Sequence, residues 1–94
     1  MNEKRKLCCP VLARGVRYRW DDLRQQHQLL FPEGMLILND TAAAIVKLCD
    51  GRSLKNLEDE LSQSFPHNPI QTDLLELLDR LAGRGLIDDA NNAS

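Results

Sequence analysis

The stretch Pro32–Asp50, PEGMLILNDTAAAIVKLCD, contains a turn, a strand and a helix in immediate succession. Its opening Pro-Glu-Gly favours a turn, because proline presets φ and glycine tolerates a positive φ. The apolar run Met35–Leu38 that follows is typical of a strand. Asn39 or Asp40 can then cap a helix that ends at the close of the stretch, before Gly51. The stretch therefore predicts the passage from a sheet to a helical layer.

Two further strands are predicted before this stretch. In Val16–Asp21, apolar or aromatic side chains alternate with charged ones, which is the period of a half-buried strand. Its expected buried face carries Val16, Tyr18 and Trp20. Gln28–Phe31 is a second short strand that pairs with the first as a hairpin. With Met35–Leu38 as the third strand, these segments predict a three-stranded antiparallel sheet.

A second helix is predicted after Gly51. Ser53 is a good N-cap, and apolar residues recur at helical spacing from Leu54 to Phe65. Pro66 then ends the helix, because proline cannot continue the hydrogen-bonding pattern.

A third helix is predicted from Asn68, as the N-cap, to about Arg84. Pro69 occupies its first helical position, where the missing N–H costs nothing. After this helix Leu86-Ile87 is expected to return to the core, and a polar tail begins at Asp88.

These elements predict an α+β fold in which a three-stranded antiparallel sheet is followed by a three-helix bundle, similar to a winged helix-turn-helix. The chain has 94 residues, which is enough for one domain. We expect that domain to cover residues 10–88, between a flexible basic N-terminal tail at residues 1–9 and a polar C-terminal tail at residues 89–94.

The composition points to a folded protein of the cytoplasm. Hydrophobic residues make up 43% of the chain and charged residues 28%, which is ordinary for a globular domain. No apolar run is long enough to span a bilayer, and the first residues do not have the pattern of a signal peptide. We therefore expect no membrane partner.

The sequence contains no recognisable catalytic or metal-binding pattern. A nucleophile elbow, a phosphate-binding loop and metal-ligand spacings of His and Cys are all missing. The adjacent Cys8 and Cys9 could form a reactive thiol pair, weakly favoured by the basic residues before them. We expect a binding module that is not an enzyme, with no catalytic residue, metal or cofactor.

The third strand and the third helix carry more apolar surface than one core requires. Met35, Leu36, Ile37 and Leu38 are apolar on both faces of a strand expected at the sheet edge, and an open edge invites pairing. The helix has one stripe of Ile70, Leu74, Leu77 and Leu81 and a second of Leu75, Leu78 and Ala82. Two interpretations stay open: a homodimer partner buries the second stripe, or this stripe faces a peptide-binding groove.

Five segments of the sequence, in this order and spacing, resemble the PqqD family of pyrroloquinoline quinone (PQQ) biosynthesis. They are spread over nearly the whole chain from Pro10 to Asp88, with Ser53-Leu54 and Phe65 as conservative departures. The segments are Arg14–Asp21, Leu30–Gly34, Leu38–Ala42, Leu48–Gly51 and Leu81–Ile87.

The resemblance implies the same sheet-then-helices fold and a role as a peptide chaperone, a RiPP recognition element. Members bind the precursor peptide PqqA and present it to the radical-SAM enzyme PqqE. In related domains the peptide lies along the third strand, beside the third helix. Mapped onto this chain, the resemblance implies a peptide-binding site made of Met35, Leu36, Ile37, Leu38, Leu75, Leu78 and Asp79.

Two alternatives share the predicted architecture. The first is a winged-helix DNA-binding protein. In that case the third helix should be basic, yet Arg80 and Arg84 are outnumbered by Asp73, Glu76 and Asp79, so we expect no nucleic-acid partner. The second is a structural dimerisation domain that uses the same apolar surface without a peptide.

Overall fold

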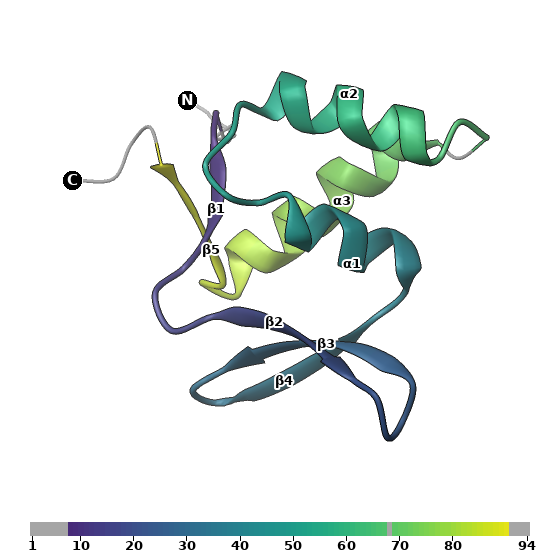
Figure 1. The fold of residues 1–94 in the computed structure, drawn as a ribbon. Coiled ribbons are helices and arrows are strands. Elements are labelled where there is room, and N and C mark those ends of the chain that lie inside the picture. Colours follow the sequence, from purple (N-terminus) through teal and green to yellow (C-terminus); the bar gives the residue numbers. More distant parts are fainter. Residues whose placement is uncertain (1–7, 68, 91–94) are drawn as a thin grey trace.

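The computed structural model describes residues 8–67 and 69–90, and within them the predicted α+β fold is confirmed. A three-stranded antiparallel sheet lies below three helices (Figure 1). The strands are β1 (Pro10–Leu12), β2 (Arg17–Asp21), β3 (Gln26–Phe31), β4 (Gly34–Leu38) and β5 (Ile87–Asp89). The helices are α1 (Asp40–Lys47), α2 (Leu54–Ser64) and α3 (Ile70–Gly83).

The larger sheet has the strand order β2-β3-β4, so β3 is central. β3 begins at Gln26, two residues before the predicted start at Gln28. The reason is the turn before it, in which the Asp21 carboxylate accepts the backbone N–H groups of Leu23 and Arg24 at 3.1 and 3.2 Å. The chain is thereby reversed early, and the polar Gln26 pairs with Asp21.

The burial of β2 differs from the predicted pattern. Trp20, expected on the buried face, is 41% exposed, whereas Asp21 is 4% exposed and Gln28 only 2%. The Gln28 amide donates to the Asp21 carboxylate at 2.9 Å, and Arg24 donates to the same carboxylate at 3.3 Å. A buried carboxylate that is hydrogen-bonded from several sides is tolerated, which explains how polar side chains occupy this position.

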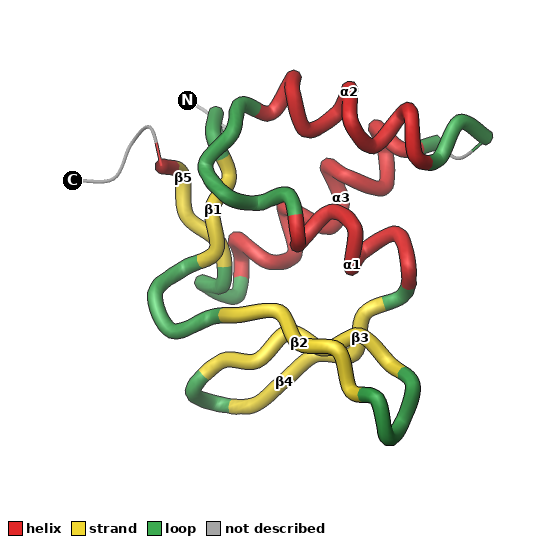
Figure 2. Tube along the Cα trace, in the orientation of Figure 1, coloured by secondary structure: helices red, strands yellow, loops and turns green. Residues whose placement is uncertain are grey.

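A second sheet, not predicted from the sequence, joins the two ends of the described chain. β1 and β5 pair antiparallel, with Pro10 opposite Asp89 and Leu12 opposite Ile87, and Figure 2 shows them side by side. The predicted polar tail from Asp88 onward is therefore wrong for Asp88 and Asp89. Hydrogen bonds also extend to Cys8 and Cys9, beyond the expected limits of residues 10–88. Residues 1–7 and 91–94 of the predicted tails lie outside the described residues.

α1 begins as predicted but ends earlier. Asn39 caps it, with its side chain accepting the Ala42 N–H at 2.7 Å. The helix ends at Lys47 and not near Asp50, because Asp50 forms a bridge with Val11 of β1 and the chain must leave the helix to reach it.

α2 and α3 also lie close to their predicted bounds. Ser53 caps α2 by accepting the Asn56 N–H at 3.1 Å. Pro69, predicted at the first helical position, is instead the N-cap residue of α3, so the helix begins one residue later than predicted, and no side-chain capping hydrogen bond forms there. The predicted cap Asn68 lies outside the described residues.

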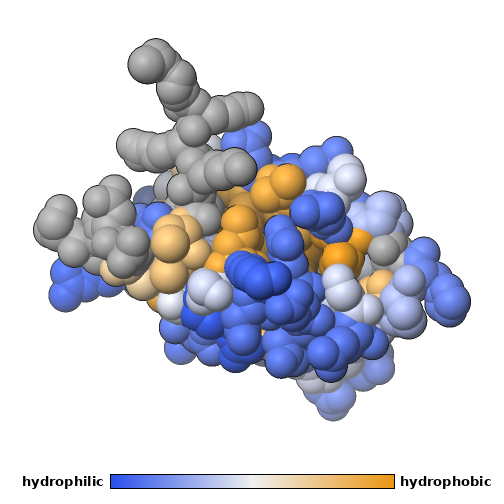
Figure 3. Space-filling view, turned by 90° about the horizontal axis from the view of Figure 1, so that it is seen from above, coloured by the Kyte–Doolittle hydropathy of each residue, from blue (hydrophilic) through white to orange (hydrophobic). Residues whose placement is uncertain are grey.

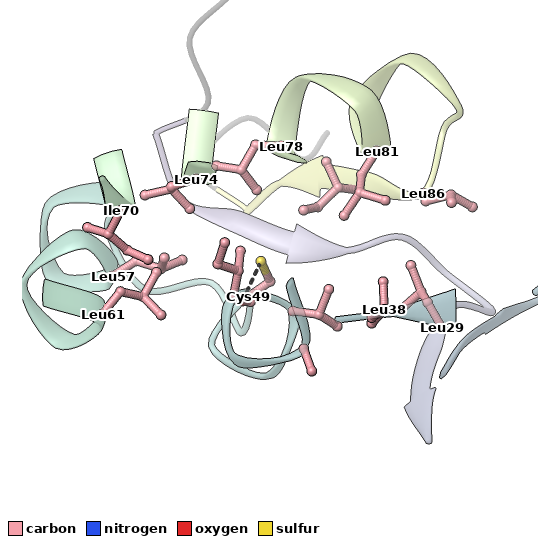
Figure 4. Close-up of a cluster of buried hydrophobic side chains, with 14 residues drawn as sticks. Leu29, Leu38, Cys49, Leu57, Leu61, Ile70, Leu74, Leu78, Leu81 and Leu86 are labelled. Atoms are coloured by element: carbon pink, nitrogen blue, oxygen red, sulfur yellow. Dashed lines mark hydrogen bonds between the residues drawn. The ribbon is translucent and has the colours of Figure 1, made fainter. Parts of the chain in front are cut away.

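The core lies between the sheet and the helices. α1 is sandwiched between the larger sheet below and α2 above, with α3 behind (Figure 1). The buried cluster draws side chains from all three helices, the larger sheet and β5 (Figure 4). Its fully buried leucines are Leu29, Leu57, Leu61, Leu74 and Leu81. None of the described helices has the length and hydrophobicity needed to cross a membrane.

Candidate functional site

β4 forms one edge of the larger sheet, as predicted. Its one neighbour among the described strands is β3, so its opposite side is left without a paired strand. The side chains alternate: Leu36 and Leu38 turn inward onto the core, while Met35 and Ile37 are 46% and 63% exposed on the outer face. Two of the four apolar residues therefore attach the strand to the core, and the other two are exposed side chains at an open edge.

A pocket of about 220 Å³ lies between the start of α1 and α3. Asn39, which follows the last residue of β4, lies at its wall. The residues from the start of α1 are Asn39, Thr41, Ala42 and Ile45. The residues from α3 are Asp73, Glu76, Leu77 and Arg80. The pocket thus combines apolar side chains with carboxylates and one guanidinium group, which suits a ligand of mixed character.

A histidine couples the sheet to the start of α1, next to this pocket. The His27 Nδ1 atom lies 2.7 Å from the Tyr18 hydroxyl, and Nε2 lies 3.1 Å from the Asp40 carboxylate. One tautomer satisfies both contacts, with the hydroxyl donating to Nδ1 and Nε2–H donating to Asp40. The Trp20 ring lies 4.8 Å from the imidazole, centroid to centroid, and the Lys47 ammonium lies 4.9 Å from the centre of the Tyr18 ring. These contacts hold the start of α1 against the sheet.

The three residues predicted on α3 do not line the pocket. Leu78 is 3% exposed and lies beside Leu74 and Leu81 in the buried cluster (Figure 4). Leu75 is 47% exposed and Asp79 is also exposed. Seen from the helical side, apolar atoms gather between hydrophilic ones (Figure 3). The structure therefore brings the predicted β4 residues together at one edge of the sheet, and neither these residues nor the three on α3 line the pocket.

From the sequence, the α3 residues that line the pocket were interpreted only as charged residues of the helix or as core residues. Asp73, Glu76, Leu77 and Arg80 follow the spacing i, i+3, i+4, i+7, which places them on one face of the helix. That spacing is a signal, but Leu77 shares it with the stripe of Ile70, Leu74 and Leu81. Periodicity alone does not tell which flank of a wide apolar face meets a neighbour.

The described residues contain no group of three or more His, Cys, Asp and Glu side chains that could hold a metal ion. Among the described cysteines, Cys49 has the thiol with the most strongly shifted pKa, which burial raises to about 12. This thiol donates a hydrogen bond to the Ile45 carbonyl at 3.2 Å. A thiol of that kind is an inert part of the core. The described residues thus offer an open strand edge at β4 and a mixed pocket between α1 and α3 that begins at the residue after this strand.

Comparison with known proteins identifies the family. The family model described as "Coenzyme PQQ synthesis protein D (PqqD)" matches residues 26–87. A "PqqA binding protein" of Methylococcus capsulatus is 38% identical over 77% of this chain and 78% of its own length. The "PqqA binding protein" of Azotobacter vinelandii is 42% identical over 84% of this chain and 88% of its own.

A solved structure agrees with these relatives. It is the solution NMR structure of the PqqD truncation of Methylobacterium extorquens PqqCD, described as a functional, stand-alone RiPP recognition element. It superposes with a TM-score of 0.70 at 38% identity, over 84% of this chain and 87% of the other. The resemblance noted in the sequence is thereby confirmed, and the chain belongs to the PqqD family.

Proposed function

We propose that this chain binds the precursor peptide PqqA by strand addition at the edge of β4 and presents it to the radical-SAM enzyme PqqE. The observation that carries the proposal is the open edge of β4, whose last residue is followed directly by Asn39 in the wall of the pocket between α1 and α3. The names of the relatives, which are PqqA binding proteins, supply the peptide.

The register of the β3–β4 hairpin defines which main-chain groups are available. Phe31 pairs with Gly34 across a turn of two residues. Such a turn closes on a hydrogen-bonded pair, and hydrogen-bonded pairs alternate with unbonded ones along an antiparallel ladder. The N–H and C=O groups of Met35 and Ile37 therefore point away from β3, toward an added strand.

An added strand would place its side chains alternately on the two faces of the sheet. One set would lie beside Met35 and Ile37 on the outer face, where both side chains are exposed. The other set would lie on the helical side, where the chain can enter the pocket lined by Glu76, Leu77 and Arg80. Alternate contacts of this kind supply specificity, and the main-chain hydrogen bonds supply affinity.

On α3 we assign the contacts to the pocket residues and not to Leu75, Leu78 and Asp79. Residues 75 and 77 are two positions apart, so at about 100° per residue they lie on nearly opposite sides of the helix. The burial of Leu78 further favours a structural role for that residue.

The size of the site supports the proposed presentation to PqqE. The β4 strand has five residues, so it can pair with only a short segment of a peptide. The remainder of the peptide would stay outside the site and within reach of an enzyme. In Methylorubrum extorquens a matching relative is a "Bifunctional coenzyme PQQ synthesis protein C/D", which supports action beside other proteins of the pathway.

The test is a titration of the isotopically labelled protein with PqqA, followed by amide NMR. We expect saturable shifts at Met35–Leu38 and at the pocket residues Glu76, Leu77 and Arg80. Amides of α2, which contributes no residue to the pocket, serve as the internal control. A peptide of scrambled sequence controls for nonspecific binding. If saturating PqqA leaves the β4 and pocket signals unmoved, strand addition at this edge is refuted.

The dimerisation alternative makes a different prediction for the free protein. A structural dimer would bury the exposed side chains of Met35, Ile37 and Leu75 without any peptide. We expect sedimentation of the free protein to give the mass of a monomer. A stable dimer that PqqA does not dissociate, with unchanged β4 amides, would favour the alternative.

A further inference from the structure

The adjacent residues Cys8 and Cys9 lie at a structural junction and are not used by the proposed peptide site. Both are free thiols, and their sulfur atoms are 3.7 Å apart. Cys8 is exposed, while Cys9 is partly buried. Two neighbouring thiols within reach of solvent and of each other can act as a two-electron redox pair.

The backbone around the two thiols is held by hydrogen bonds from three directions. The two oxygens of the Asp89 carboxylate accept the N–H groups of Cys8 and Cys9 at 2.9 and 3.0 Å. The Cys8 carbonyl accepts the N–H of Leu54, the first residue of α2, at 2.9 Å. The Cys9 carbonyl accepts the N–H of Ala90 at 2.8 Å. The pair therefore connects the start of β1 to the end of β5 and to the start of α2.

We propose that Cys8 and Cys9 form a site of reversible oxidation by small-molecule disulfides such as oxidised glutathione. The product is a disulfide between the two neighbouring residues, and its formation weakens the hydrogen bond that holds the first residue of α2.

The reaction consists of two exchanges. The Cys8 thiolate attacks one sulfur of oxidised glutathione, so that a mixed disulfide forms and one glutathione thiolate leaves. The Cys9 thiolate then attacks the Cys8 sulfur and expels the second glutathione. Both departing thiolates take up the protons that the two cysteines lost. Overall, the protein loses two hydrogen atoms and one molecule of oxidised glutathione becomes two molecules of the reduced form.

The environments of the three cysteines set the order of attack. Partial burial, the Cys8 thiol and the Asp89 carboxylate raise the pKa of Cys9, so Cys9 is the less ready of the two to attack first. Cys8 is exposed to the reagent. Cys49, which is 4% exposed, stays out of the reaction and provides an internal reference.

The disulfide between Cys8 and Cys9 strains the peptide bond that joins these two residues. Adjacent α-carbons are about 3.8 Å apart, whereas ordinary disulfides join α-carbons about 4.4–6.8 Å apart. The peptide between Cys8 and Cys9 must twist to close the ring. That peptide contains both the carbonyl that holds Leu54 and the N–H that donates to Asp89. A strained disulfide is also readily reduced, so we expect the oxidation to be reversible.

The test combines mass spectrometry with hydrogen exchange on the full chain. After treatment with oxidised glutathione we expect the mass to fall by two hydrogen atoms, with the change confined to the segment that contains Cys8 and Cys9. Dithiothreitol should reverse it. The exchange of the Leu54 amide should rise about fivefold, the effect of losing one hydrogen bond of ordinary strength.

Three variants serve as controls. Cys8→Ser and Cys9→Ser keep the main-chain hydrogen bonds and should not lose the two hydrogen atoms, whereas Cys49→Ser should react like the wild type. A lasting glutathione adduct on Cys8, or a disulfide between two chains, would overturn the proposal. So would an oxidised pair with an unchanged Leu54 amide.

Discussion

The substitution Ile37→Pro tests whether the edge of β4 pairs with the peptide. Proline removes the N–H at a position where, by the hairpin register, that N–H points to the open edge. Ile37 is 63% exposed, so its side chain contributes little to the core. Proline is also tolerated on edge strands where no ladder hydrogen bond is lost. We therefore expect the variant to fold and to bind PqqA more weakly.

The size of the effect follows from two losses. One main-chain hydrogen bond is worth about 0.5–1.5 kcal/mol, and one cross-strand side-chain contact about 0.2–1 kcal/mol. Together these amount to about 0.7–2.5 kcal/mol, so the dissociation constant should rise about 3- to 70-fold. Ile37→Ala keeps the N–H and loses the side-chain contact alone, so its effect should not exceed about fivefold.

The assay is isothermal titration calorimetry with PqqA, on the wild type and both variants at the same salt concentration. Leu75→Ala is the matched control, because Leu75 is also a large exposed apolar side chain but lies on α3 away from the pocket. We expect it to bind as the wild type does. Amide spectra and urea midpoints establish that each variant is folded. A folded Ile37→Pro protein with wild-type affinity would refute strand addition at this edge.

Three further predictions concern the folded state. Leu29→Ala removes a side chain with no exposed surface from the central strand. Urea unfolding should show that the free energy of unfolding falls by about 2–5 kcal/mol. A smaller decrease would mean that the surrounding side chains collapse into the space that Leu29 leaves. The Arg52 side chain lowers the pKa of Asp50 from 3.8 to about 2. The stabilisation by this ion pair is therefore present above pH 3.8 and is lost as the pH falls toward 2. Asp50→Asn should make the free energy of unfolding less dependent on pH in that window, and an unchanged pH dependence would contradict the assignment. Because burial raises the pKa of Cys49 to about 12, iodoacetamide should label it only after unfolding, whereas labelling in the native protein would contradict its burial.

Much of the fold can be predicted because its signals are local. The turn before Met35, the cap at Asn39 and the leucine spacing of α2 act between residues a few positions apart. Each of these elements therefore lies within a few residues of its predicted bounds. The identity of the strand at the sheet edge follows from the same kind of reasoning, because consecutive hairpins place the third strand outermost.

The features that the sequence leaves open depend on contacts between distant residues. The pairing of Pro10 with Asp89 joins two three-residue strands from opposite ends of the chain, too short to show a period. The burial of Gln28 depends on Asp21 across the hairpin.

The candidate site shows the same division. By itself the sequence determined that Met35–Leu38 forms an apolar strand before a capped helix, and it placed that strand at an edge. Only the tertiary structure decided which flank of α3 meets the pocket, since Leu75 and Leu77 belong to apolar stripes of similar strength. The physical reason is that periodicity defines the faces of a helix, whereas its rotation about its own axis is set by the side chains of α1, α2 and β5 packed against it.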